Sequence, residues 1–287
     1  MQRGVLMERI TAQLVCSMLP PRQDDGHKGT FGKVYVCGGC VGYTGAPVYA
    51  GEAAVRTGSG LVFVGVPEEI YPIAAARCDA AMVHPLPRRD ELLERIQACD
   101  AALIGPGLGR AGHTEKLVLS LLENLTVPIV LDADGINAVS THIHILDERR
   151  GATVLTPHEG EFARLDGSFL PGRSDRVHSA ADFAQKHNCV VVLKGPGTVV
   201  ASPDGRVLQN TTGNCGMAKG GSGDILAGMI LSLIGQGAGA VEAAACAVWI
   251  HGRAGDIAGK ELTAYAMAPS DLLGRLPAVF KELEDQM

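Results

Sequence analysis

PIVLDAD at residues 128–134 and CVVVLKG at residues 189–195 are the stretches that decide the fold. Each is a run of consecutive apolar residues followed by charged and small residues. A strand that is apolar at every position is buried on both faces, as in a parallel sheet covered by helices. Both stretches therefore predict central strands of an α/β fold.

Similar apolar runs, separated by helical patterns, extend outward from these two. The predicted strands cover residues 33–37, 61–66, 101–104, 128–132, 153–156 and 189–194. The predicted helices between them cover residues 46–56, 90–98, 114–125 and 179–187. This alternation is that of repeated βαβ units. The predicted fold class is α/β, with a mostly parallel central sheet flanked by helices on both faces.

The pattern changes after residue 194. Two β-prone runs, 198–201 and 206–209, flank Pro-Asp-Gly at residues 203–205, and Asp-Gly between such runs is a strong hairpin signal. Two apolar helices are predicted next, at residues 224–237 and 241–254. The sequence therefore predicts a β-hairpin and a helical pair after the βαβ units.

The start of the chain is different in character. Residues 1–27 read as a helix followed by a polar, Gly-rich loop, because Pro20 and Pro21 end the helical pattern. No later segment is a linker long enough to separate two domains. We predict a short N-terminal helix and loop at residues 1–27 and one catalytic domain at residues 28–287.

Composition excludes several classes of partner. The chain has 287 residues and a formal net charge of −6, which disfavours nucleic acid and anionic membrane surfaces. No run reaches the roughly 18 apolar residues that a membrane span needs. The eight cysteines lie mostly in apolar or Ala-rich runs, which is typical of reduced thiols in a cytoplasmic protein.

The most informative motif is Gly220-Gly221-Ser222-Gly223-Asp224, a glycine loop that enters a predicted helix. The first N–H groups of a helix lack internal partners and carry the positive end of the helix dipole, so they can bind a phosphate. A carboxylate beside a bound phosphate is repelled, which favours a task for Asp224 such as accepting a hydroxyl proton. The alternative is that Asp224 only caps the helix.

Other motifs are weaker. No Walker-type G-x-x-x-x-G-K-[ST] occurs, and the G-x-G-x-x-G match at residues 107–112 lies mid-chain after a stiffening Pro106. Cys37 and Cys40 form a C-x-x-C, but no second pair at metal spacing supports zinc. His158 follows a predicted strand, where open α/β sheets place ligands; a hydrogen-bonded loop histidine is the equal alternative.

Taken together, six blocks in order resemble the ADP-dependent NAD(P)H-hydrate dehydratases of the ribokinase-like superfamily, over roughly residues 28–280. The blocks are GGCVGYTGAPVYAGEAAVRTGSGLV, IGPGLGR, VLDADGINAV, TPHEGEF, KGPGT and GNCGMAKGGSGDILAG. The resemblance implies that ADP phosphorylates the C6 hydroxyl of hydrated NADH or NADPH. Expulsion of phosphate then gives NAD(P)H and AMP. It also implies Mg²⁺, a β-hairpin near the nucleotide site and a homo-oligomer, with a tetramer expected.

The resemblance also implies roles for residues at matching positions. Asp224 is the expected catalytic base, and the backbone of Gly221, Ser222 and Gly223 is expected to stabilise the transferred phosphoryl group. The expected nucleotide-binding residues are Lys194, Gly195, Pro196, Gly197, Thr198 and Gly223. The residues expected to hold the hydrated dinucleotide, together with Asp224, are Ala46, Gly107, Asn137 and His158. Glu161 is the expected metal-side carboxylate.

Several alternatives stay open at this point. A vitamin-precursor kinase of the same superfamily would share the glycine loop and base, and an ATP-dependent dehydratase would need a similar pocket. A non-catalytic nucleotide-binding protein would not need Asp224. Lys219 beside the loop is either a phosphate contact or a solvated lysine. Residues 1–27 are too short for the epimerase domain of some relatives, so we expect the dehydratase step alone.

Overall fold

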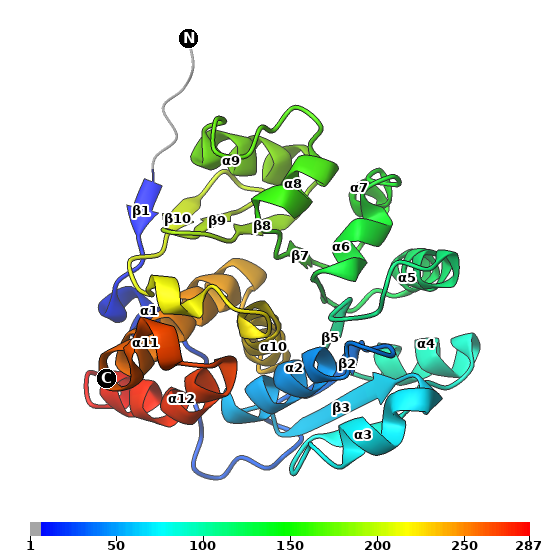
Figure 1. The fold of residues 1–287 in the computed structure, drawn as a ribbon, viewed down its shortest axis with the longest axis horizontal. Helices are drawn as coiled ribbons and strands as arrows, with labels where there is room; N and C mark the ends of the chain where they lie inside the picture. The colour runs from blue at the N-terminus through cyan, green and yellow to red at the C-terminus, as the bar shows by residue number, and fades with distance from the viewer. Residues whose placement is uncertain (1–6) are drawn as a thin grey trace.

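The computed structural model describes residues 7–287, which form one sheet between two layers of helices (Figure 1). The strands are β1 (Met7–Arg9), β2 (Lys33–Cys37), β3 (Leu61–Val66), β4 (Met82–Pro85), β5 (Ala101–Ile104), β6 (Ile129–Leu131), β7 (Thr153–Leu155), β8 (Val190–Leu193), β9 (Val199–Ala201) and β10 (Val207–Gln209). The helices are α1 (Ala12–Met18), α2 (Gly45–Arg56), α3 (Tyr71–Ala75), α4 (Arg89–Gln97), α5 (Gly112–Asn124), α6 (Asp134–Val139), α7 (Ile145–Glu148), α8 (Glu159–Leu165), α9 (Arg176–Lys186), α10 (Ser222–Gly235), α11 (Ala240–Ala266) and α12 (Pro269–Glu284). Two short 3₁₀ turns, η1 (Glu68–Ile70) and η2 (Cys215–Met217), complete the chain.

The ten strands lie in the order β1-β10-β9-β8-β7-β6-β5-β2-β3-β4. Only β9 runs antiparallel to its neighbours, so the sheet is mostly parallel, as predicted. Strands β9 and β10 form the predicted hairpin, which closes where the Ser202 amide donates to the Arg206 carbonyl at 3.0 Å. The chain builds outward from β2 in one direction and then from β5 in the other.

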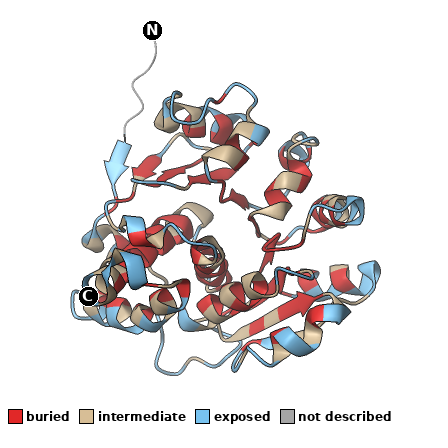
Figure 2. Ribbon diagram, viewed as in Figure 1, coloured by how far each residue is buried: buried red, intermediate tan, exposed pale blue. Residues whose placement is uncertain are grey.

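The two faces of the sheet bury separate cores, because alternate residues of each strand point to opposite sides. The central strands are buried along their length (Figure 2). On β2, Val34 and Val36 pack on the face covered by α1, α2, α10, α11 and α12. Tyr35 and Cys37 face the other layer, formed by α4 to α9. The helices on both faces were predicted from strands that are apolar at every position.

Helices α2 and α10 lie against each other at the centre of the first layer (Figure 1). A Cβ built on Gly228 of α10 would lie 2.1 Å from the carbonyl oxygen of Ala50 on α2, so only glycine permits this approach. The contact brings the first turns of the two helices to the same edge of the sheet. That edge carries the candidate site.

Several elements were not predicted from the sequence, among them the short helices α3, α6, α7 and α8. Strands β1 and β4 are short edge strands, and α12 closes the C-terminus against α11. The N-terminal segment, read as a helix and loop, also contains β1, which pairs with β10, and its first six residues lie outside the described part. Ile10 and Val15 are fully buried in the core, so this segment packs onto the rest of the fold.

Candidate functional site

A cleft of about 700 Å³ opens at the carboxyl ends of the strands. It lies where the strand order reverses, between β2 and β5, which is the position at which open α/β sheets bind ligands. Its walls come from the loops after β2, β5 and β6, from α2 and α6, and from the first turns of α8 and α10. The lining residues are Gly42, Tyr43, Gly45, Ala46, Tyr49, Gly107, Gly109, Arg110, Ala133, Asp134, Asn137, Glu161, Gly220, Gly221 and Asp224.

The glycine loop opens α10 at the floor of this cleft. Gly221 is the N-cap in a left-handed conformation with φ of 108°, which glycine adopts without strain. Over residues 7–287, no acceptor pairs with the backbone N–H groups of Gly220, Gly221, Gly223 or Asp224. Ser222 differs from the expectation, because its N–H donates to the Lys219 carbonyl at 3.2 Å and closes a turn. The free amides flank Ser222 rather than include it.

Asp224 stands at the third position of α10 and lines the cleft. No side-chain hydrogen bond caps this helix, so the capping alternative has no support in the geometry. The carboxylate therefore faces the cleft beside the free amides. This arrangement suits a base next to an anion site.

A second polar group lies behind Asp224, and it was not predicted as a group. Lys194 donates to the Asp132 Oδ1 atom at 3.0 Å, and Thr156 donates to the same oxygen at 2.6 Å. Asp132 is 2% exposed. These residues follow β6, β7 and β8 directly, so neighbouring parallel strands deliver all three to one edge. Their positions after three predicted strands were the signal that could have found Asp132 and Thr156.

Electrostatics couple the two groups. Burial and the nearby charge of Asp132 raise the pKa of Asp224 to about 7, against the opposing effect of Lys194. Burial opposes the charge of Lys194, but Asp132, Glu161 and Asp224 together raise its pKa above the ordinary value. The site thus holds a cation among three carboxylates, one of which titrates near neutral pH.

The raised pKa of Asp224 predicts that, as pH increases, the reaction rate rises while the stability of the fold falls. A base must be ionised, so kcat/KM is expected to rise as pH increases through about 7 and then level off. A carboxyl whose folded pKa lies above the unfolded value stabilises the fold only while protonated, so its contribution is lost as pH rises from about 4 through 7. Rate profiles and thermal unfolding from about pH 5 to pH 8 check both signs. A flat rate profile would contradict the assignment of the base.

His251 on α11 lies behind the loop and was also not predicted. Its Nε2 atom and the Ser222 Oγ atom are buried without partners in the described chain. Burial lowers the pKa of His251 to about 4 against the opposing effect of the Ser222 backbone. The ring is therefore neutral at pH 7, and the positive field of the loop comes from its amides and Lys194.

The KGPGT segment follows β8 as a tight loop. Gly195 and Gly197 have positive φ, and Thr198 Oγ1 donates to the Gly195 carbonyl at 2.9 Å. Arg176 anchors the loop by donating to the carbonyls of Pro196 at 2.8 Å and Leu193 at 2.9 Å. Lys194 reaches the floor of the cleft, since a Cβ built on Gly223 would lie 3.2 Å from its ammonium. None of the five residues of the segment, Lys194 included, is among those that line the cleft.

His158 and Glu161 form a reciprocal capping box at the start of α8. His158 Nδ1 accepts from the Gly160 amide at 2.9 Å, and Glu161 Oε2 accepts from the His158 amide at 2.9 Å. Glu161 lines the cleft, whereas His158 does not. Residues 7–287 contain no cluster of three His, Cys, Asp or Glu side chains able to hold a metal. Mg²⁺ held by one carboxylate and substrate phosphates needs no such cluster, so Glu161 fits that mode.

The remaining predicted residues lie on the opposite wall of the cleft. Ala46 and Gly107 line the cleft, and a Cβ built on Gly107 would lie 3.1 Å from the Ala46 Cβ. Asn137 donates to Asp134 Oδ1 at 3.2 Å, and the Gly109 amide donates to Asp134 Oδ2 at 2.9 Å. Gly107 therefore belongs to a loop that lines the cleft.

Backbone strain also concentrates at this wall. Ala133 has φ of 48° and ψ of −112°, a conformation that an alanine adopts only at an energetic cost. It connects β6 to α6 and lines the cleft. Such residues cluster at binding sites, which supports a functional role for this edge.

The structure also places Lys219 and the two cysteines of the C-x-x-C motif. Lys219 donates to the carbonyls of Tyr265 at 2.8 Å and of Met267, so it fastens the glycine loop to the end of α11. Lys219 is not among the residues that line the cleft. Cys37 is buried, Cys40 is half-buried, and both are free thiols.

The fold and the site define a class of protein, a ribokinase-like α/β protein with a glycine loop at the start of α10. A ribokinase-like superfamily protein from Enterococcus faecalis V583 superposes with a TM-score of 0.86 at 29% identity, covering 96% of each chain. The model of the NAD(P)H-hydrate dehydratase family matches residues 34–278. The chain belongs to the NAD(P)H-hydrate dehydratase family.

Named relatives agree with this membership. The chain is 43% identical over 97% of its length to the bifunctional NAD(P)H-hydrate repair enzyme Nnr of Moorella thermoacetica, of which it spans 54%, about half. It is 39% identical to the ADP-dependent (S)-NAD(P)H-hydrate dehydratase of Neisseria meningitidis serogroup B, over 82% of this chain and 80% of that protein. The ADP/ATP-dependent NAD(P)H-hydrate dehydratase of Bacillus subtilis, co-crystallized with ATP/Mg²⁺, is 30% identical with a TM-score of 0.83, covering 96% of this chain and 98% of that one.

Proposed function

We propose that this chain is an ADP-dependent (S)-NAD(P)H-hydrate dehydratase, a carbon-oxygen lyase that repairs hydrated NADH and NADPH. The observation that carries the proposal is the Asp224 carboxylate at the cleft floor, flanked by free amides of the glycine loop and free of any capping bond. The printed name of the Neisseria relative supports the substrate and the nucleotide.

The reaction begins with phosphoryl transfer. Asp224 accepts the proton of the C6 hydroxyl while that oxygen attacks the β-phosphorus of ADP, and the bond to the bridging oxygen breaks to release AMP. The free amides of Gly221 and Gly223 and the ammonium of Lys194 stabilise charge on the moving phosphoryl group. Mg²⁺, positioned by Glu161 and the nucleotide, would neutralise phosphate charge.

Elimination completes the repair. The C6 hydroxyl is a poor leaving group, whereas its phosphate ester leaves readily. The ring nitrogen lone pair expels phosphate, and loss of a proton from C5 restores the double bond of NAD(P)H.

Residues Lys194 to Thr198 are proposed to bind the nucleotide. Ala46, Gly107, Asn137 and His158 are proposed to hold the dinucleotide, with His158 acting through the first turn of α8 that it caps.

The test is recovery of the reduced nicotinamide. Purified protein with hydrated NADH, ADP and Mg²⁺ is expected to restore the near-ultraviolet absorbance of NADH, with one AMP and one phosphate formed per NADH. A parallel reaction with ATP measures donor choice. No recovery with either nucleotide would remove the proposal. A stable phosphorylated product without elimination would instead favour a kinase of the same superfamily.

We further propose that the protein is cytoplasmic, because its eight cysteines are free thiols. We also propose that it forms a homo-oligomer, a tetramer, because its sequence contains many Gly and Ala residues. Light scattering of the purified protein measures the subunit number. Within residues 7–287, no helix combines the length and apolarity needed to cross a bilayer.

A further inference from the structure

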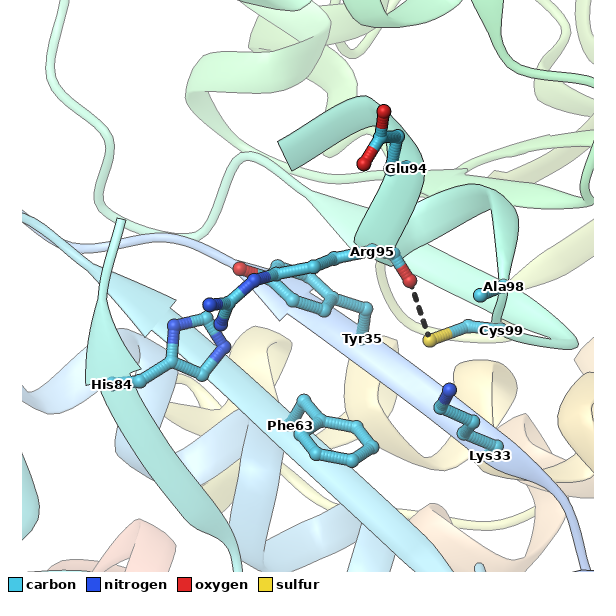
Figure 3. A pocket seen from close by; sticks show the side chains of 8 residues that line it. All are labelled: Lys33, Tyr35, Phe63, His84, Glu94, Arg95, Ala98 and Cys99. Carbon is cyan, nitrogen blue, oxygen red and sulfur yellow. Dashed lines mark hydrogen bonds between the residues drawn. The ribbon is translucent and has the colours of Figure 1, made fainter. Parts of the chain in front are cut away.

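A second cavity, of about 350 Å³, lies between strands β2, β3 and β4 and helix α4 (Figure 3). None of its lining residues lines the catalytic cleft, and it faces the other layer of helices. Lys33 and Tyr35 of β2, Phe63 of β3 and His84 of β4 form its sheet side, and Arg95 of α4 lies across it. The proposed repair reaction uses none of these groups.

Two buried polar atoms in this cavity lack partners. The Tyr35 Oη and His84 Nε2 atoms have no hydrogen bond within the described chain, although Tyr35 is only 1% exposed. The two rings lie 5.4 Å apart, so both orphan atoms belong to one end of the cavity. The other nitrogen of His84, Nδ1, lies 2.9 Å from the Pro85 carbonyl, which makes it the donor and leaves Nε2 as an acceptor. Buried polar atoms without partners are costly and call for an occupant.

The opposite end of the cavity carries an unpaired cation. Lys33 Nζ lies 5.5 Å from the centre of the Phe63 ring, and no carboxylate of residues 7–287 lies within ion-pair distance of it. Arg95 is already paired with Glu91 at 2.6 Å on the outer side. In Figure 3 the Phe63 ring lies between Lys33 at one end and His84 with the Tyr35 hydroxyl at the other. The cavity is therefore cationic, then aromatic, then hydrogen-bonding along its length, and Glu94 of α4 is the one acidic residue among those that line it.

We propose that this cavity binds a small flat hydroxyaryl carboxylate. The carboxylate pairs with Lys33, the ring lies on Phe63, and the ligand hydroxyl donates to His84 Nε2 while it accepts from the Tyr35 hydroxyl. The ligand thereby satisfies both orphan atoms and the unpaired ammonium. Arg95 covers the hydroxyl end and moves aside as the ligand enters, since its side chain is 46% exposed.

The test uses three matched probes and two variants, with binding measured by calorimetry and ligand-observed NMR. 4-Hydroxybenzoate is expected to bind with a Kd of about 1 mM, as befits a fragment. Benzoate, which lacks the hydroxyl, and 4-hydroxybenzamide, which lacks the charge, are each expected to bind about tenfold more weakly.

The two variants test whether Lys33 contacts the ligand carboxylate and whether Tyr35 contacts the ligand hydroxyl. Lys33→Met is expected to abolish the preference for 4-hydroxybenzoate over 4-hydroxybenzamide and to leave the preference over benzoate unchanged. Tyr35→Phe is expected to reduce the preference over benzoate, since His84 Nε2 still accepts from the ligand hydroxyl, and to leave the preference over 4-hydroxybenzamide unchanged. Both variants should unfold cooperatively and keep the turnover of the parent protein. Equal binding of the three probes, preferences unmoved by the variants, displacement by ADP, or no binding at about 10 mM would each overturn the proposal. If Tyr35→Phe fails to fold, Lys33→Met still decides.

Discussion

Asp224→Asn is expected to lower kcat by about 10²–10⁴-fold while the protein stays folded, because the amide cannot accept the hydroxyl proton. Asn keeps the shape and the position of the side chain at the cleft floor. Nucleotide binding is expected to persist or to tighten, since the replacement removes a negative charge that repels the phosphates. Steady-state rates with hydrated NADH and ADP, together with ADP binding by calorimetry, measure the two effects.

Stability provides the matched control for this substitution. Asp271 occupies the same third position of α12, but it caps that helix by accepting from the Ala268 amide at 2.7 Å. Asp271→Asn is expected to cost about 0.3–1 kcal/mol of unfolding free energy, because a negative charge near the N-terminus of α12 is lost, and to leave the rate unchanged. Asp224→Asn is expected to raise the stability above about pH 7, because it removes a buried charge whose pKa is raised. Equal destabilisation by the two variants would return Asp224 to a capping role.

The central strands were predictable because burial on both faces leaves a local signature. β6 and β8 are apolar at every position, and nothing about their neighbours was needed to find them. Strand β1 is Met-Glu-Arg, exposed along its length and paired on one side only. Its existence depends on the β10 edge that it joins, and no pattern within three residues can encode that pairing. The same holds for β4 on the opposite edge.

The residues of the site also differ in how well the sequence predicts them, depending on whether they are adjacent in the chain. The glycine loop and Asp224 are adjacent in the chain, so their chemistry could be inferred from a single motif. Asp132, Thr156 and Lys194 come together only through the register of three parallel strands. The sequence was also misleading within the glycine loop itself. The Ser222 amide was expected to be free, but it donates to the Lys219 carbonyl in a turn. Which amides of a loop stay free depends on its exact dihedral angles.

Lys194→Met is expected to produce the largest combined loss, because Lys194 serves both the fold and the reaction. The substitution leaves Asp132, 2% exposed, with Thr156 as its one remaining side-chain donor among residues 7–287. Removing one partner of a buried ion pair costs about 3–5 kcal/mol, so a marked fall in the urea midpoint is expected. The rate of NADH recovery is expected to fall by about 10²–10³-fold, as for the loss of a charge-stabilising donor.

The double variant Lys194→Met with Asp132→Asn separates the two roles. The neutral amide that replaces the Asp132 carboxylate still accepts from Thr156 and carries no unpaired charge, so most of the lost unfolding free energy is expected to return. The rate is not expected to return, because no cation then faces Gly223 and the migrating phosphoryl group. The rate profile of the single variant is also expected to shift to higher pH, since Lys194 lowers the pKa of Asp224. Recovery of rate and stability together would mean that Lys194 acts only by neutralising Asp132.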